Sequence, residues 1–151
     1  MKKMIILCSM LLCITFMTAC GSLNAATHNT SDKDSAIIEM ELDQNYDESD
    51  PFINEKLFCV LDDLDNLTAE GTFEMDGEKG ILEVKNNKTN EVLWSKTWEQ
   101  NVKSEKFSVS LADLKKDDEY VVSFTGTKIN QAKIKITFNN SLVEERERPL
   151  Q

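Results

Sequence analysis

The chain has 151 residues, with 17 Lys plus Arg against 27 Asp plus Glu and a formal net charge of −10. This length suits one domain, and the excess of acidic groups repels nucleic acid and anionic lipid surfaces, which argues against both as electrostatic partners. His28 is the one histidine of the sequence, so we expect no histidine-based catalytic triad and no histidine-rich metal site.

The N-terminal residues have the pattern of an export signal. Two lysines at positions 2 and 3 precede an apolar run over residues 4–16, and residues 17–20 read Met-Thr-Ala-Cys. The uncharged stretch from 4 to 19 is shorter than the ~20 residues that a membrane-spanning helix needs. It therefore predicts a cleaved signal peptide.

Residues 17–20 resemble the lipobox of bacterial lipoproteins, in which small residues precede a cysteine and an apolar residue precedes those. The resemblance implies cleavage after Ala19, loss of residues 1–19, and a diacylglyceryl thioether on Cys20. Two or more acyl chains give stable anchoring. The expected location is thus the extracytoplasmic face of the bacterial cell membrane, and the alternative is an ordinary secreted protein cut nearby.

Residues 20–50 are predicted to form a lipidated, acidic and disordered tether. Between 21 and 50 the chain carries eight acidic residues against one lysine, Lys33. Such a segment buries too little surface to offset the entropy of ordering, and its self-repulsion keeps it extended. The apolar patch at 36–42 leaves an alternative, a short helix or strand that docks on the domain. Residues 143–151 are expected to form a flexible tail.

Between residues 51 and 142 the hydrophobic period is two, which is typical of antiparallel strands with one buried face. An Asn-rich turn at 86–90 predicts a hairpin between its flanking strands. Seven strands are expected, at 56–61, 67–75, 80–85, 91–98, 105–111, 119–127 and 131–139. Short strands with turns at this spacing favour a two-sheet sandwich, with a small barrel as the alternative.

Residues 107–124 resemble the tyrosine-corner segment of fibronectin type III and other immunoglobulin-like domains. Leu114 before the turn and Tyr120 after it match that segment's two roles. The resemblance implies that the leucine packs inward and that the tyrosine hydroxyl bonds back to the backbone. It implies an all-β fold, a seven-stranded antiparallel immunoglobulin-like sandwich over residues 51–142, and it carries no function.

Residue types that support catalysis are scarce. A nucleophile needs a base within hydrogen-bond reach, and His28 lies in the predicted tether, so we expect no enzyme. Cys59 would be the free thiol of the mature chain, since Cys8 and Cys13 leave with the signal peptide. It lies in an apolar stretch, where cysteine behaves as a small buried hydrophobe; a reactive or intermolecular thiol is the alternative.

Two groups of acidic residues are the candidate metal ligands. In a seven-stranded sandwich the first, third and fifth loops share one end, which would bring them together near the amides of Asn86, Asn87 and Asn90. Ca²⁺ is coordinated by hard oxygen ligands, although no EF-hand spacing is present and solvated turn residues are the alternative. The candidates are Asp62, Asp63 and Asp65 in one loop and Asp113, Asp117 and Asp118 in the other. Ca²⁺ is the one cofactor that the sequence suggests.

Trp94 and Trp98 lie four residues apart on one predicted strand and therefore share a face. Trp94 is expected in the core. Trp98 lies at the strand end, where it either packs in the core or rim or forms an exposed platform for a sugar or peptide.

The sequence therefore predicts a lipid-anchored, extracytoplasmic, non-catalytic binding module for an unidentified extracellular protein or glycan. Strand edges offer main-chain pairing to another protein. The alternatives are a Ca²⁺-binding or carbohydrate-binding accessory domain and a structural envelope component.

Overall fold

A computed structural model describes residues 35–45 and 49–147 of the chain. The predicted signal peptide, Cys20, His28 and residues 148–151 lie outside these ranges. Every regular element in the described part is a strand, and every pairing is antiparallel, which confirms the all-β prediction. The strands are β1 (Ile37–Asp43), β2 (Phe52–Val60), β3 (Leu64–Asn86), β4 (Val92–Glu99), β5 (Val102–Leu114), β6 (Glu119–Phe138) and β7 (Val143–Arg146).

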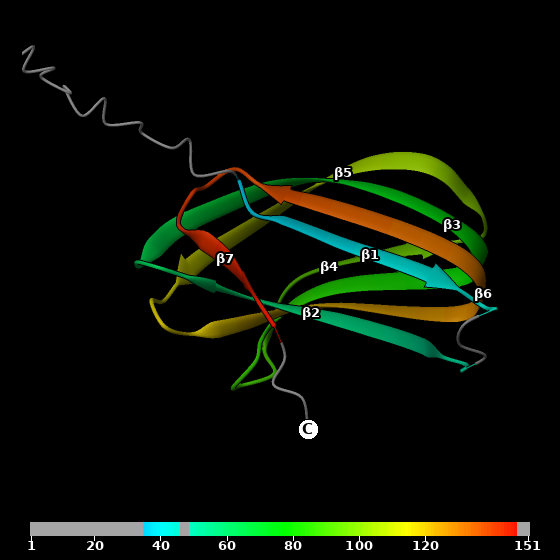
Figure 1. Cartoon of the computed structure of the whole chain (residues 1–151), viewed down its shortest axis with the longest axis horizontal. Helices are drawn as coiled ribbons and strands as arrows, with labels where there is room; N and C mark the ends of the chain where they lie inside the picture. Colours follow the sequence, from blue (N-terminus) through cyan, green and yellow to red (C-terminus); the bar gives the residue numbers. More distant parts are fainter. Residues whose placement is uncertain (1–34, 46–48, 148–151) are drawn as a thin grey trace, which may run out of the picture. The chain divides into compact units, whose positions relative to one another are not determined.

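The strands form one continuous sheet around two long strands, β3 and β6, of 23 and 20 residues. These two strands pair with each other along most of their length. On the outer side of β3, β5 pairs with the first half and β4 with the second half. On the outer side of β6, β2 pairs with the first half and β1 with the second, and β7 pairs with β2 (Figure 1).

The sheet bends where the register of β3 and β6 shifts, between Asp76 and Gly77. Lys128, on the opposite strand, has a left-handed φ of 49°. A Cβ at Gly77 would lie 2.5 Å from Cδ1 of Ile129 and 2.9 Å from the Lys128 carbonyl oxygen. Glycine therefore allows the two backbones to approach closely at an irregularity that bends both strands.

This bend corrects two predicted boundaries. The turns expected at 76–79 and 128–130 are irregularities within continuous strands, so 67–75 and 80–85 are halves of β3, and 119–127 and 131–139 are halves of β6.

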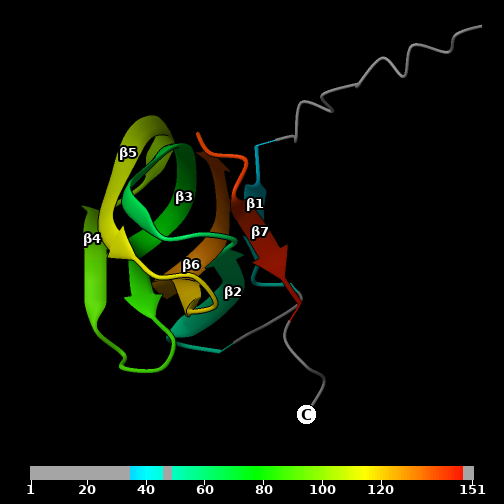
Figure 2. The same cartoon turned by 90° about the vertical axis from the view of Figure 1, so that its left-hand side faces the viewer.

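An immunoglobulin-like sandwich has two separate sheets, whereas this chain has one sheet that curls over its own core (Figure 2).

Two strands lie where the sequence predicted tether and tail. β1 falls within residues 20–50, and its inner side chains Ile38, Met40 and Leu42 are buried. The docking alternative for residues 36–42 is therefore the one that the structure contains, in the form of a strand. The acids of β1 alternate with these apolar residues, so the charges face away from the core while the strand still buries one face. β7 falls within residues 143–151 and buries Val143.

The core lies between the two halves of the curled sheet. Phe58 packs against Phe138 and Tyr120, with ring centroids 4.8 and 5.3 Å apart, and Phe73 packs against Phe124 at 5.7 Å. These aromatic side chains come from β2, β3 and β6, so they join the middle strands of both halves. In the two described ranges we find no helix with the length and apolar character needed to cross a membrane.

Candidate functional site

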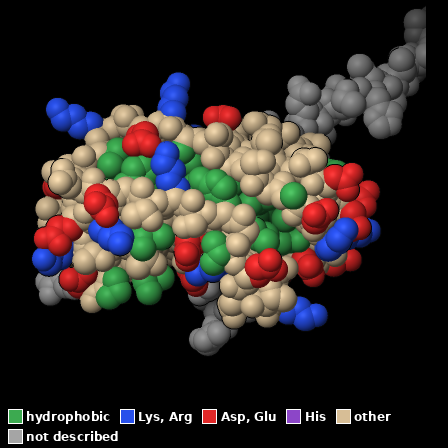
Figure 3. Space-filling view, turned by 180° about the vertical axis from the view of Figure 1, so that it is seen from behind, with side chains coloured by type: hydrophobic (Ala, Val, Ile, Leu, Met, Phe, Trp, Pro, Cys, Tyr) green, Lys and Arg blue, Asp and Glu red, His purple; other side chains and the backbone are tan. Residues whose placement is uncertain are grey.

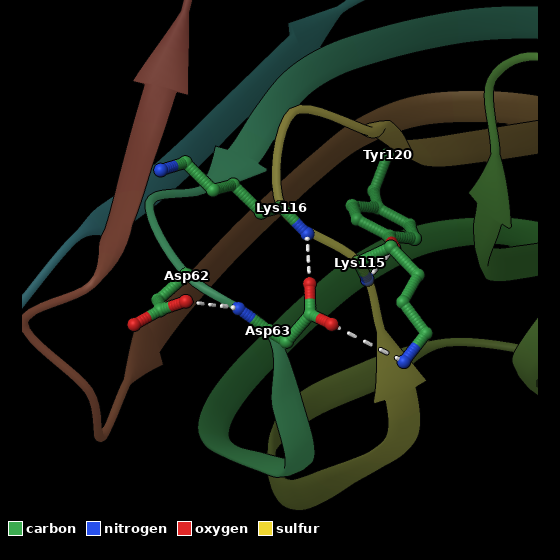
Figure 4. Close-up of polar contacts among 5 residues, drawn as sticks. All are labelled: Asp62, Asp63, Lys115, Lys116 and Tyr120. Atoms are coloured by element: carbon green, nitrogen blue, oxygen red, sulfur yellow. Dashed lines mark hydrogen bonds and ion pairs between the residues drawn. The ribbon is translucent and has the colours of Figure 1, made fainter.

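The loops that follow β2, β3 and β5 meet at one end of the sheet, as the sequence predicted. The backbone N–H of Lys116 donates to Oδ1 of Asp63 at 2.9 Å, and the Lys115 ammonium lies 3.5 Å from Oδ2 of Asp63 (Figure 4). Asn86 donates to Asp118 through its side-chain amide at 3.4 Å. These contacts tie all three loops together.

Tyr120 holds the loop between β5 and β6. Its hydroxyl accepts a 2.8 Å hydrogen bond from the backbone N–H of Lys115, five residues upstream (Figure 4). Both Tyr120 and Leu114 are buried, with 2% and 1% of their surface exposed. Burial raises the pKa of Tyr120 above its ordinary value, and the bond from Lys115 opposes that rise. The contact is the one that the tyrosine-corner resemblance implied.

The Asp63 carboxylate binds the loop between β5 and β6. The bond from the Lys116 backbone N–H lowers the pKa of Asp63 below its ordinary value, with a further contribution from the charge of Lys115. Asp62 accepts a hydrogen bond from the N–H of Asp63 at 2.9 Å. The carboxylates nearest this end are thus engaged by the protein's own donors.

The remaining candidate ligands do not gather around a common point. Asp65 lies exposed on β3, Asp113 and Asp117 are exposed residues with left-handed φ angles, and Asp118 is half-buried beside Asn86. Among residues 35–45 and 49–147, no three His, Cys, Asp or Glu side chains lie close enough together to hold a metal ion. The loops therefore converge without assembling a carboxylate cluster.

Trp98 packs in the core, which is one of its two expected positions, whereas Trp94, expected in the core, is only half-buried against it. Trp98 is 5% exposed, stacks on Phe73 with centroids 4.1 Å apart, and meets the edge of Phe107 at 5.4 Å. The interpretation of Trp98 as an exposed platform is wrong, because its end of β4 lies over the core at the sheet bend. Trp94, nearer the N-terminal end of β4, is half-buried and stacks on Phe107 with ring centroids 5.8 Å apart.

A charged pair covers the gap between β4 and β5. Lys96 lies between the two tryptophans on their face of β4, and its ammonium is 2.7 Å from Oε1 of Glu105 and 5.1 Å from the Trp98 ring centroid. The bond from Lys96 lowers the pKa of Glu105 below its ordinary value. Hydrophobic side chains reach the surface between charged ones on this side of the molecule (Figure 3).

Four strands, β1, β4, β5 and β7, have one whole edge without a strand partner in the described part of the chain, and β2 lacks an outer partner over residues 52–56. Natural sheets protect such edges with inward-pointing charges, bulges or short strands. β4 and β5 carry Lys96 and Glu105 pointing inward, and the pairing of each with β3 contains a register shift. β7 is four residues long. These three edges are therefore protected.

Within residues 35–45 and 49–147, the edge of β1 has none of these protections. Its seven residues pair with β6 in one uninterrupted register and include no Lys, no Pro and no inward charge. Phe138 donates to the Ala36 carbonyl at 2.9 Å, and Gln44 donates to the Asn130 carbonyl at 3.0 Å. Even-numbered residues thus bond to β6, and the N–H groups of odd-numbered residues point to the free edge.

The outward face of β1 is acidic and paired. Glu39 lies 2.8 Å from Lys135, and Glu41 lies 3.9 Å from Lys133. The bond from Lys135 lowers the pKa of Glu39 below its ordinary value. Ile37, at the start of the strand, is 44% exposed. β1 lies within the predicted tether, and the alternation of apolar and acidic residues over 37–43 is the sequence pattern that indicates a strand there.

Cys59 is buried, as its apolar neighbours predicted, and it accepts a 3.0 Å hydrogen bond from Nε of Arg146. This contact joins β7 to β2 on the face of the sheet turned away from the core, because Phe58 and Val60 point into the core. β7 therefore covers the Cys59 thiol on this face of the sheet.

These features define the class of protein: an all-β domain made of one curled antiparallel sheet, with three loops joined at one end and, within the described residues, a free strand edge along β1. The chain belongs to the family described as Domain of unknown function (DUF4624), whose model matches residues 22–150. The match begins two residues after Cys20 and includes both β1 and β7. No curated protein matches the chain.

Proposed function

We propose that this protein is a lipid-anchored, extracytoplasmic, non-catalytic binding module that takes up an extended segment of another protein beside β1. The unprotected edge of β1 carries the proposal. Four backbone N–H groups, those of Ile37, Glu39, Glu41 and Asp43, face this edge, and main-chain pairing is how sheets recruit extended peptides.

Charge defines the chemistry of the partner. Side chains on an added strand lie opposite those of β1, and opposite charges in such pairs stabilise the sheet. Glu39 and Glu41 keep 64% and 66% of their side chains exposed beside Lys135 and Lys133. With Asp43 they favour a segment with Lys or Arg at alternate positions, and exposed Ile37 favours an apolar residue beside it. A second copy paired antiparallel about Met40 places Glu39 opposite Glu41, which disfavours self-association through this edge.

The anchor rests on the sequence pattern at 17–20 and on the family boundary. The family model begins at residue 22, so the region it describes follows directly on Cys20. Sixteen residues, 21 to 36, separate Cys20 from the start of β1. A chain of this length spans at most about 55 Å when fully extended, which would keep the β1 edge close to the membrane.

The edge is tested by Glu39→Pro. The N–H of Glu39 points away from β6, so proline removes no bond of the sheet and removes one donor from the free edge. Displayed peptide libraries supply the probe. We expect selected peptides to carry basic residues at alternate positions and to lose about tenfold or more in affinity for Glu39→Pro.

Glu39→Gln is the matched control, because it keeps the backbone donor and removes the charge. It should weaken binding less than Glu39→Pro does. Selected peptides that bind Glu39→Pro as tightly as the unaltered chain would contradict strand addition at β1.

The anchor is tested separately by Cys20→Ser, which removes the sulfur that would carry the lipid. We expect the protein to move from the membrane fraction to the soluble extracytoplasmic fraction. Retention in the membrane fraction would refute the anchor and leave the proposal for the β1 edge standing.

A further inference from the structure

A hollow of about 700 Å³ lies at the bend of the sheet, beside the turn that joins β4 to β5. Its walls are residues 77–79 of β3, residues 99–101 at the turn, and Thr127 of β6. Small-molecule sites in proteins have volumes of about 300–1,000 Å³. The size of the hollow therefore suits a ligand of a few rings.

The backbone around this hollow is held by three contacts. The N–H of Gly77 donates to Oδ1 of Asn101 at 2.9 Å. The N–H of Gln100 donates to the Glu78 carbonyl at 2.8 Å, and the Lys128 ammonium lies 2.8 Å from Oε1 of Glu78. These contacts join the turn to both long strands, so a ligand meets a surface that is already formed.

Four polar side chains of the hollow are available to a ligand. Lys79 lies opposite Glu99 of β4 and opposite Thr127 of β6, so these three side chains form one row across the sheet. Within residues 35–45 and 49–147, their side chains make no hydrogen bond or ion pair with the protein, and neither does the side-chain amide of Gln100.

These groups match the chemistry of a neutral sugar. The charges of Lys79 and Glu99 cancel, and amide and hydroxyl groups both donate and accept hydrogen bonds, as sugar hydroxyls do. A charged ligand would be repelled by one member of the Lys79 and Glu99 row. Ile81 lies on the same face two residues after Lys79 and is half-buried, so it offers an apolar contact to the C–H side of a sugar ring.

A second hollow of about 460 Å³ adjoins the first, and Asn101 lines both. It presents a similar mixture of groups, with Glu74, Lys103 and Gln131 among its lining residues. In the described part of the chain the side chains of these three residues make no hydrogen bond or ion pair. Two adjoining hollows of this kind suit a chain of sugar units.

We propose that the two hollows form one groove, divided by Asn101, that binds a neutral oligosaccharide. The inference goes beyond the proposed function and does not depend on it, since the first hollow contains no residue of β1.

The test is NMR titration of the full chain with two neutral linear tetrasaccharides, one of glucose and one of N-acetylglucosamine. We expect at least one of them to shift the backbone amide signals of Lys79, Gln100, Asn101 and Thr127, with a dissociation constant of about 1 mM or lower. If neither tetrasaccharide shifts these signals, the inference is overturned.

Two variants test the contacts of the first hollow. Thr127→Val keeps the shape of the side chain and removes its hydroxyl. Gln100→Gly removes the amide and keeps the backbone, because Gln100 has a left-handed φ of 67° that glycine adopts freely. Each should weaken binding about fivefold or more.

Thr137→Val is the matched control, because it makes the same change on β6 outside both hollows. It should leave the affinity unchanged. Binding that survives both Thr127→Val and Gln100→Gly without loss, or that falls equally with Thr137→Val, would overturn the inference.

Discussion

The ring of Phe107 lies directly over Gly71, and a Cβ at Gly71 would come within 2.1 Å of the ring's ζ carbon. The two residues are opposite each other where β3 pairs with β5. The same ring contacts Trp94 and Trp98 on its other sides. Because Gly71 has no side chain, the Phe107 ring can pack against β3 and contact both tryptophans of β4.

Gly71→Ala should therefore destabilise the protein, although alanine suits a strand better than glycine does. The ring must move against two tryptophans, and overpacking of this kind costs about 1–3 kcal/mol. Denaturant unfolding measures the change. Thr72→Ala, on the exposed face of β3, is the control and should change stability by less than about 0.5 kcal/mol. Equal stability of Gly71→Ala and the unaltered chain would show that the ring shifts freely.

Tyr120→Phe should lower the free energy of unfolding by about 1–3 kcal/mol, because it leaves the Lys115 N–H without its acceptor. The ring and its packing against Phe58 are retained. Thermal or urea unfolding checks the loss. Ser110→Ala removes an exposed hydroxyl from β5 and serves as the control. If both variants unfold at the midpoint of the unaltered chain, the hydroxyl contributes nothing to the loop.

Asp63 should make stability depend on pH in the acid range. Its pKa is lower in the folded chain than its ordinary value of 3.8, so its contribution is present above that value and is lost as pH falls through the folded pKa. The difference in urea midpoint between the unaltered chain and Asp63→Asn should shrink on acidification. Asp65→Asn controls for the loss of one negative charge. A difference that stays constant with pH would argue against the Asp63 contact.

The tryptophans should differ in fluorescence. With Trp94→Phe, the remaining Trp98 is nearly fully buried, so its emission should lie at shorter wavelength and resist quenching by acrylamide. With Trp98→Phe, the remaining Trp94 is half-buried and should be quenched more strongly. Stern–Volmer constants for the two variants provide the measurement. Equal constants would contradict the assigned burial.

Local pattern was a sound guide wherever a strand buries one face and exposes the other. The alternation over 105–111 follows from it, and so does the meeting of three loops through the contacts Asp63–Lys116 and Asn86–Asp118. The pattern failed at 76–79 and 128–130, where Gly, Asp, Lys and Asn are typical of turns. Those residues instead allow a bend in two strands that stay paired through it.

The composition of a segment misled at both ends of the domain. The charge count places residues 37–43 in an acidic tether, with a docked helix or strand as the alternative, and Ile38, Met40 and Leu42 bury one face once β6 lies beside them. The charges of Glu39 and Glu41 are offset by Lys135 and Lys133, which lie almost a hundred residues away in the chain. A count of charges over neighbouring residues in the sequence misses these ion pairs, because both lysines come from β6.

The sequence by itself determined the class of fold, because period-two alternation depends only on which residues are apolar and in what order. It also determined the Tyr120 corner, a contact over five residues. Only the tertiary structure decided that β1 and β7 join the sheet, that β3 and β6 are continuous, and that Trp98 is buried. The physical reason is that each of these depends on partners distant in the chain, whose contacts exist only after the sheet has curled around its core.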